Sequence, residues 1–128
     1  MPAWIVDGMN VIGSRPTGWW RDRRGAMRAL ARRLDAFAAA AGDDVEVVFD
    51  GRAFDLGSLE RVGARFAPRR GRDAADDEIV RVVAAAPDPA GLRVVTSDGE
   101  LAARVRAHGA AVVGSGAFLR ELDERAPE

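Results

Sequence analysis

Short apolar runs alternate along this chain with longer stretches whose apolar residues recur every three or four positions, and this alternation restricts the available folds. The runs that predict buried strands lie at 3–7, 44–50, 64–67, 92–98 and 110–114. The spacing that predicts helices lies at 21–41, 73–86, 99–108 and 115–125. Strands that are apolar throughout are typical of a parallel sheet covered on both faces. The order therefore predicts an α/β fold, with a mostly parallel sheet of four to five strands and helices on both faces.

The segments between these elements carry turn and helix-breaking residues. The stretch from 8 to 20 contains Gly13, Pro16 and Gly18 and is predicted to be a loop, as is the stretch 68–73. Residues 54–63 are ambiguous, with room for one helical turn. A length of 128 residues, without repeats or a low-complexity linker, fits one domain over 1–128.

The charge is balanced overall but uneven along the chain. All 19 basic residues are arginine, against 20 acidic residues. Seven arginines and one aspartate lie between 15 and 33, and five arginines without any acid lie between 61 and 72. Separated basic and acidic regions are compatible with a phosphate-binding rim around an acidic centre, and equally with solvated helix faces.

Several classes of protein do not fit this sequence. The absence of cysteine excludes a disulfide framework and thiolate chemistry. The first ten residues lack the features of a signal peptide, and no segment approaches the roughly 18 apolar residues of a membrane span, so a cytoplasmic protein without membrane contact is expected. No glycine-rich phosphate loop follows a strand, which argues against a nucleotide cofactor. The single histidine, His108, falls at a predicted helix end, where a cation favours the helix dipole.

Three of the predicted strands end in the same dipeptide, Asp-Gly. The aspartates are Asp7, Asp50 and Asp98. In an open parallel sheet the carboxyl ends of the strands lie along one edge, and ligands bind there, where the strand order reverses. With the strand order 3-2-1-4-5 and neighbouring strands about 4.8 Å apart, these three carboxylates would meet in one small volume.

A predicted helix start adds further carboxylates just before the fourth strand. The segment RDAADDE places Asp73 and Asp76 three residues apart on one helix face, while Asp77 points elsewhere. Carboxylates packed this closely repel one another and stay ionised only if a cation or several donors offset their charge. Mg²⁺ and Mn²⁺ prefer such oxygen ligands and assist displacement at phosphorus, so the pattern indicates an acidic metal site.

Each of these acids also has a purely structural explanation. Asp7 and Asp50 can be the turn residues of Asp-Gly pairs. Ser97 and Glu100 have the spacing of a helix capping box. Asp73 can cap its own helix. The residues by themselves leave both explanations open.

Four short motifs resemble those of one nuclease family. IVDGMNVIG is similar to the opening of the NYN branch of PIN-like nucleases, and VVFDG to the second-strand motif of the YacP-like group within that branch. RDAADDEI resembles the acidic helix start of that group, commonly E-T-A-D, and VTSDG resembles its fourth-strand ending. Together the motifs follow the family's order over nearly the whole chain. The resemblance implies a three-layer PIN-like fold and a divalent-metal-dependent endoribonuclease that uses Mg²⁺ or Mn²⁺.

By position, the resemblance also assigns roles to individual residues. The metal-binding and catalytic acids would be Asp7, Asp76 and Asp98. Asn10 would join them as a catalytic residue that orients Asp7 or a substrate phosphate. The supporting positions would be Asp50, Asp73 and Ser97.

The chain departs from the family pattern at four places. Met9 stands where an aromatic residue is usual, and Asp73 is one methylene shorter than the usual glutamate. The loop before Asp73 carries an unusual PRRGR segment, and relatives often run further beyond the last helix. These departures make Asp73 and the tail the points at which function could differ from that of the family.

The resemblance implies RNA as the partner, with ribosome association as one option and a monomer or homodimer as the oligomeric state. The predicted contacts to the RNA backbone are Arg69, Arg70 and Arg72 in one loop and Arg15, Arg21, Arg23 and Arg24 on the opposite rim. Trp19 and Trp20 either stack on bases or anchor the entrance to the first long helix. Two other functions stay open: a non-catalytic RNA- or ribosome-binding module of the same fold, and a metal-dependent phosphohydrolase of small molecules.

Overall fold

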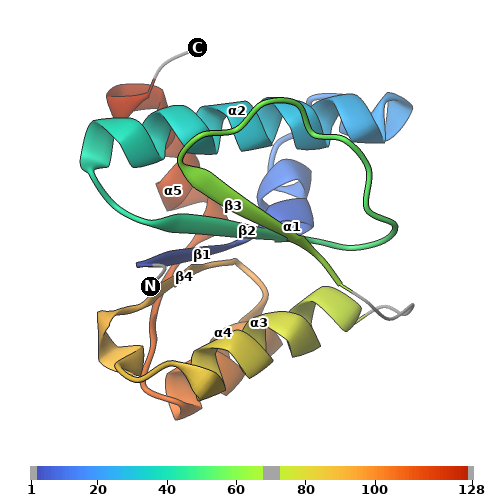
Figure 1. Cartoon of the computed structure of the whole chain (residues 1–128). Helices are drawn as coiled ribbons and strands as arrows, with labels where there is room; N and C mark the ends of the chain where they lie inside the picture. Colours follow the sequence, from blue (N-terminus) through green and yellow to red (C-terminus); the bar gives the residue numbers. More distant parts are fainter. Residues whose placement is uncertain (1–2, 68–72, 127–128) are drawn as a thin grey trace.

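A five-stranded parallel sheet forms the centre of the computed structural model, which describes residues 3–67 and 73–126 (Figure 1). The strands are β1 (Trp4–Asp7), β2 (Val45–Phe49), β3 (Val62–Phe66), β4 (Arg93–Val95) and β5 (Ala111–Val113). Every neighbouring pair is parallel, and the order is β3-β2-β1-β4-β5. This confirms the predicted α/β fold and its strand order 3-2-1-4-5.

Helices cover both faces of the sheet (Figure 1). One face carries α1 (Gly8–Gly13), α2 (Arg23–Ala41) and α5 (Ser115–Arg125), and the other carries α3 (Ala74–Ala85) and α4 (Gly99–Ala107). Short 3₁₀ turns, η1 (Trp19–Arg21) and η2 (Pro89–Gly91), lie in the connections. Among the helices of the described residues, none is long and apolar enough to cross a membrane.

The sheet separates two apolar cores, and β1 contributes to both. Trp4 and Val6 pack into the core shared with α2 and α5, whereas Ile5 packs into the core shared with α3 and α4. The Trp4 ring lies 5.5 Å from the Phe37 ring and 5.4 Å from the Phe118 ring, measured between centroids. Because both faces of β1 are buried, its sequence is an uninterrupted apolar run.

The predicted loop from 8 to 20 is wrong in its first part, because residues 8–13 form α1. The glycines at both ends are poor helix formers, so the local sequence does not predict a helix here. Val11 is only 1% exposed, and Ile12 packs against the same core. A helix this short is marginal in water, so its stability comes from this tertiary packing.

Four of the five strands are shorter than their apolar runs, and β3 is shifted toward the N-terminus. β4 ends at Val95, so residues 96–98 lie beyond the strand and are available for side-chain contacts. β3 begins at Val62, two residues before the predicted start, and residues 54–61 contain no helical turn. The polar ends of the strands therefore belong to the edge of the sheet rather than to its interior.

Asp35 of α2 fixes the connection that leads into β3. Its Oδ1 accepts hydrogen bonds from the backbone N–H groups of Glu60, Arg61 and Val62, at 3.1, 2.6 and 2.9 Å. Burial by itself would raise the pKa of Asp35, but these three bonds outweigh it and lower the pKa below its ordinary value.

Replacing this carboxylate, in Asp35→Ala, is expected to lower the free energy of unfolding by about 1–3 kcal/mol, because backbone donors lose their acceptor. Since the pKa is lowered in the folded state, this stabilisation is present above the ordinary pKa of an aspartate and is lost as the pH falls through the folded value. Urea unfolding at pH 7 and pH 3 measures both effects. Asp88→Ala, at an exposed position, is the control; equal stabilities of the two variants at pH 7 would contradict the assignment.

An acidic candidate active site at the carboxyl edge of the sheet

Asp7 ends β1 and is the most enclosed carboxylate at this edge. The residue is 5% exposed, and its Oδ2 accepts a hydrogen bond of 2.9 Å from the Thr96 hydroxyl. Gly8 follows because α1 begins directly against β2: a Cβ atom at this position would lie 2.5 Å from the Phe49 ring. Asp7-Gly8 is therefore a tight strand-to-helix junction. The alternative explanation of Asp7 as an ordinary turn residue does not hold.

The residues that follow β4 lie beside Asp7 because β1 and β4 pair in register, with Val6 opposite Val95. Thr96 is 1% exposed, and its hydroxyl donates to Asp7 and accepts from the backbone N–H of Asp98 at 3.1 Å. One buried hydroxyl thus holds the ends of β1 and β4 in a fixed relation.

Asp98 occupies the N-cap of α4. Its Oδ1 accepts hydrogen bonds from the backbone N–H groups of Glu100 and Leu101, at 2.9 and 3.3 Å. The capping-box alternative is therefore wrong in its cap residue, which is Asp98 and not Ser97. One carboxylate oxygen of Asp98 is engaged in the cap, and this fixes the direction of the other.

The end of β2 and the start of α3 bring three further aspartates to the same edge. Asp50 Oδ1 accepts a hydrogen bond of 3.2 Å from a backbone N–H in the first turn of α3, which ties that helix to β2. Asp76 is partly buried in this turn, and Asp73 sits at the N-cap position without a side-chain capping bond. Asp77, which the spacing predicted to point elsewhere, forms an ion pair with Arg104 of α4 at 3.0 Å.

The carboxylates of this edge interact electrostatically. Burial raises the pKa of Asp7 to about 6; the Thr96 hydrogen bond opposes this rise, while the charges of Asp50 and Asp98 add to it. Burial also raises the pKa of Asp76 to about 7, and the negative charges of neighbouring aspartates contribute to this rise. These neighbours are Asp7, Asp98, Asp73 and Asp50. We call these five residues the acidic cluster. They come from three strand ends and one helix start that are far apart in the sequence.

The donor chemistry of the acidic cluster fits a hard divalent cation. Carboxylate oxygens are the ligands that Mg²⁺ and Mn²⁺ prefer, and a cation would offset the repulsion that raises these pKa values. Over residues 3–67 and 73–126, however, no group of three or more histidine, cysteine, aspartate or glutamate side chains is arranged to hold a metal ion as it stands. Side-chain rotation would have to bring the oxygens closer together around an ion.

Asn10, in the middle of α1, joins α1 to two other elements. Its Oδ1 accepts hydrogen bonds from the Ser97 backbone N–H at 2.8 Å and from the Ser115 hydroxyl at 2.7 Å. Ser97 in turn accepts a hydrogen bond from the Ser115 backbone N–H at 2.9 Å. The Asn10 side chain therefore positions the turn after β4 against the start of α5, while a hydrogen bond from the Asn10 backbone N–H lowers the pKa of Asp7.

Two polar residues of this edge, Thr96 and Ser115, were not predicted from the sequence. Thr96 is identifiable in retrospect, because the parallel register that pairs Val6 with Val95 places the next residue beside Asp7. Ser115 is fully buried at the start of α5, and no local pattern in the sequence marks its contact with Asn10.

The predicted RNA-binding arginines occupy different environments. Arg15 forms an ion pair with Asp123 of α5 at 2.8 Å. Arg24 lies over the Phe54 ring, 4.9 Å from its centroid, and Arg21 and Arg23 are exposed near the start of α2. Arg69, Arg70 and Arg72 lie outside the described residues.

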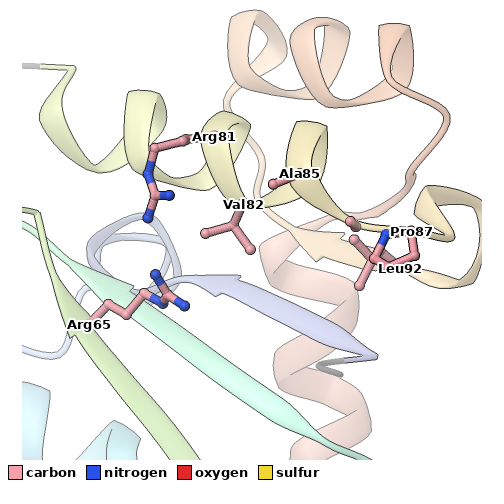
Figure 2. A pocket seen from close by; sticks show the side chains of 7 residues that line it. Arg65, Arg81, Val82, Ala85, Pro87 and Leu92 are labelled. Atoms are coloured by element: carbon pink, nitrogen blue, oxygen red, sulfur yellow. The ribbon is translucent and has the colours of Figure 1, made fainter.

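A separate cavity of about 210 Å³ lies between α3 and the sheet, on the side of the α3 carboxyl end (Figure 2). Arg65 and Arg81 extend toward it, over an apolar wall that includes Val82 and Leu92. No member of the acidic cluster lines this cavity, so it is distinct from the candidate active site.

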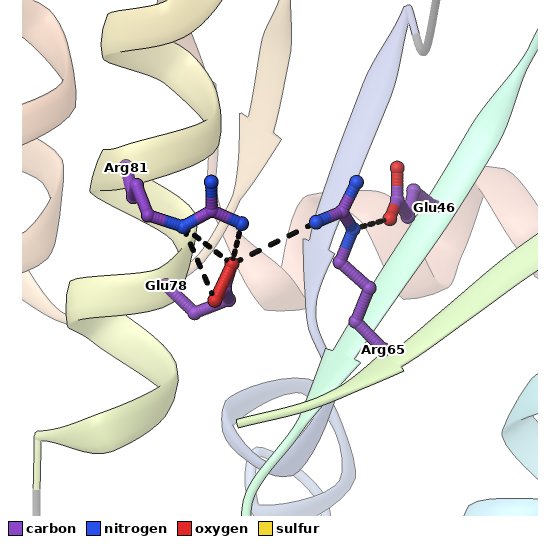
Figure 3. A network of polar contacts seen from close by, with 4 residues as sticks. All are labelled: Glu46, Arg65, Glu78 and Arg81. Carbon is purple, nitrogen blue, oxygen red and sulfur yellow. Dashed lines mark hydrogen bonds and ion pairs between the residues drawn. The ribbon is translucent and has the colours of Figure 1, made fainter. Parts of the chain in front are cut away.

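The two arginines beside this cavity are already paired with acids (Figure 3). Arg65 of β3 contacts Glu46 of β2 and lies 3.7 Å from Glu78 of α3, and Arg81 also binds Glu78. Glu78 is 9% exposed, so its charge needs these partners. The network joins β2, β3 and α3, and its two positive charges are balanced by two negative ones.

The parallel sheet with this strand order, its helices and its acidic carboxyl edge make an α/β fold of the PIN-like class. The model of the YacP-like NYN domain family matches residues 4–128. The chain belongs to this family, whose members are PIN-like nucleases.

Solved structures give the same assignment. The chain is similar to the crystal structure of a point mutant of Rae1 (YacP) from Bacillus subtilis, with a TM-score of 0.80 and 26% identity over 97% of this chain and 76% of that chain. A second crystal structure of Rae1 matches with a TM-score of 0.74 and 24% identity, over 97% of this chain and 75% of that chain. A search among curated proteins found no significant match.

Proposed function

We propose that this chain is a divalent-metal-dependent endoribonuclease, formed by one domain over 1–128, that hydrolyses phosphodiester bonds of single-stranded RNA. The observation that carries the proposal is the gathering of five carboxylates at one edge of the sheet, where burial first and the neighbouring negative charges second raise the pKa of Asp7 to about 6 and that of Asp76 to about 7. Strongly perturbed carboxylates gathered at a strand-order reversal are typical of functional sites. Membership of a PIN-like nuclease family, whose proteins generally use divalent metals, supports the same conclusion.

In the proposed mechanism, Asp7, Asp76 and Asp98 would hold Mg²⁺ or Mn²⁺. A bound divalent ion supplies Lewis acidity at a phosphate oxygen and lowers the pKa of a water molecule. Thr96 holds Asp7 Oδ2 in place, and the cap of α4 fixes Asp98. This preorganisation limits the reorientation that the carboxylates need during the reaction.

The remaining residues of the site would support and position the substrate. Asp50 holds the start of α3, so that Asp76 stays beside Asp7. The side-chain oxygen of Asn10 is occupied by Ser97 and Ser115, so its amide NH₂ is the group we assign to a substrate phosphate. Asp73 would assist as a weaker ligand from its exposed position.

The predicted basic rim would bind the RNA backbone, and binding should then weaken steeply with salt. Of its members among the described residues, Arg21 and Arg23 are exposed, whereas Arg24 lies over the Phe54 ring and Arg15 is engaged with Asp123. The same surface would suit ribosomal RNA. We therefore propose that the chain also associates with ribosomes in the cytoplasm. Cosedimentation of the purified chain with ribosomes tests this association.

A matched pair of variants on one helix turn tests the proposal. Asp76→Asn should lower Mn²⁺-dependent cleavage of single-stranded RNA by about 10–100-fold or more, because it removes a member of the acidic cluster. Asp77→Asn removes the same charge one residue away, at a side chain that forms an ion pair with Arg104 and is not a member of the acidic cluster, so its rate should stay near that of the parent chain. Equal rates for both variants would remove Asp76 from the mechanism.

A substrate panel separates the proposal from the two other functions. The parent chain should cleave RNA with Mn²⁺ or Mg²⁺ and lose activity in EDTA, while small phosphate esters remain intact. Hydrolysis of the esters without RNA cleavage would indicate a phosphohydrolase. Salt-sensitive RNA binding without any turnover would indicate a binding module.

A further inference from the structure

The adjacent tryptophans Trp19 and Trp20, which the sequence treats alike, have different environments. Trp19 packs at the end of α1, where a Cβ atom at Gly13 would lie 3.9 Å from its ring. Trp20 is 59% exposed and is the single large hydrophobic side chain that stands exposed within the described part of the chain. Its ring meets the edge of Trp19, with centroids 6.0 Å apart and planes at 85°. Trp19 therefore anchors the entrance to α2, and that anchoring role does not explain Trp20.

The exposed indole lies among cations. Arg21, Arg23 and Arg24 are all exposed and lie within four residues of Trp20 along the chain, at the entrance to α2. The one acid in this segment, Asp22, accepts the backbone N–H of Gly25 at 3.0 Å and so caps α2. An exposed aromatic ring within a basic segment has the chemistry that single-stranded nucleic acids require, namely a stacking surface beside cations for phosphates.

This segment is also close to the acidic cluster along the chain. Only α1, six residues long, separates Asp7 from the connection that carries the tryptophans. A helix of that length spans about 9 Å. Trp19 contacts the far end of α1 at Gly13, so its ring lies roughly that distance from the strand end, and the Trp20 ring is 6.0 Å from the Trp19 ring. In Figure 1, α2 begins on the side of the molecule where α3 also begins.

We propose that Trp20 is a base-stacking platform that holds a nucleotide next to the scissile phosphate of single-stranded RNA, with Arg21 and Arg23 binding the adjoining phosphates. The proposal rests on the RNA substrate proposed above and specifies how that substrate is held. Stacking accepts any base, so the platform fixes the position of the strand rather than its sequence. An acidic protein partner or a membrane would not require one base at a defined position.

Binding in EDTA, without turnover, tests the platform separately from catalysis. Trp20→Ala should weaken binding of a single-stranded RNA 12-mer by about 5- to 140-fold. This range is the stacking energy of one base, converted to affinity at about 1.4 kcal/mol per tenfold. Trp20→Phe should retain most of the affinity. The salt dependence should keep its slope in Trp20→Ala and should become shallower by about 0.7 in Arg23→Gln, because only the second variant loses a phosphate contact.

Single abasic sites in the RNA locate the stacked nucleotide. In the parent chain, an abasic site at one position should weaken binding as much as Trp20→Ala does, and the two losses should not add. Unchanged affinity of Trp20→Ala, or additive losses at every abasic position, would overturn the platform. Absence of metal-dependent cleavage in a chain that shows this Trp20 dependence would count against the proposed nuclease activity and leave the platform standing.

Discussion

The variant Asp7→Asn is expected to lose RNA cleavage by at least about 100-fold while remaining folded. Asp7 is the most enclosed member of the acidic cluster, and the loss of a ligand carboxylate affects both metal affinity and the stabilisation of charge at phosphorus. The asparagine side chain can still accept the hydrogen bond from Thr96, so the ends of β1 and β4 should stay together. The measurement is the rate of Mn²⁺-dependent cleavage of single-stranded RNA, with circular dichroism to verify the fold.

The matched control for this variant is Asp88→Asn. Asp88 precedes β4, is exposed and forms no side-chain cap, so the same change of charge occurs away from the acidic cluster. Its cleavage rate should stay within about twofold of the parent rate, as for surface substitutions in general. Cleavage by Asp7→Asn at the rate of Asp88→Asn would remove Asp7 from the mechanism.

The metal-free protein is expected to become less stable as the pH rises from about 4 to 7. The pKa of Asp7 is about 6 in the folded state against 3.8 ordinarily, so over this interval the folded chain binds more protons than the unfolded chain. Ionising this carboxyl inside the fold therefore costs up to about 3 kcal/mol, and Asp76 acts in the same direction. Asp35 and Asp123 have lowered pKa values, so they make the folded state more stable as the pH rises. This opposite change in stability occurs at lower pH than that of Asp7.

Urea unfolding in EDTA at pH 5, 6, 7 and 8 measures this dependence. Asp7→Asn removes the charge, so it should be more stable than the parent chain at pH 8 and should show a weaker slope. Addition of Mn²⁺ at pH 8 should raise the melting temperature of the parent chain and leave that of Asp7→Asn nearly unchanged, because a ligand stabilises only the state that binds it. A parent stability that is flat between pH 5 and pH 8 would contradict the repulsion described for the acidic cluster.

Much of the site was predictable because it depends on topology. The apolar runs determine which segments are strands, and the parallel order sends the ends of β1, β2 and β4 to one edge. That rule predicts that Asp7, Asp50 and Asp98 lie at the same edge, without any knowledge of side-chain contacts. Helix α5 was predicted with the bounds it has, because its apolar spacing is regular and it follows a glycine.

The parts that were missed depend on contacts between segments far apart in the chain. Helix α1 has weak local propensity and forms because Val11 is buried against α2 and α5. The Asn10 side chain binds Ser115 of α5, 105 residues further along the chain, and no local pattern predicts that partner.

The sequence by itself determined which segments are strands and helices, which strands end in an aspartate and the basic character of the segment before α2, because these depend on periodicity and on residue type. Only the tertiary structure decided which of the two tryptophans faces solvent, which residue caps α4 and which hydroxyl holds Asp7. Burial and hydrogen-bond partners depend on how distant segments pack, and a local pattern carries no information about that packing.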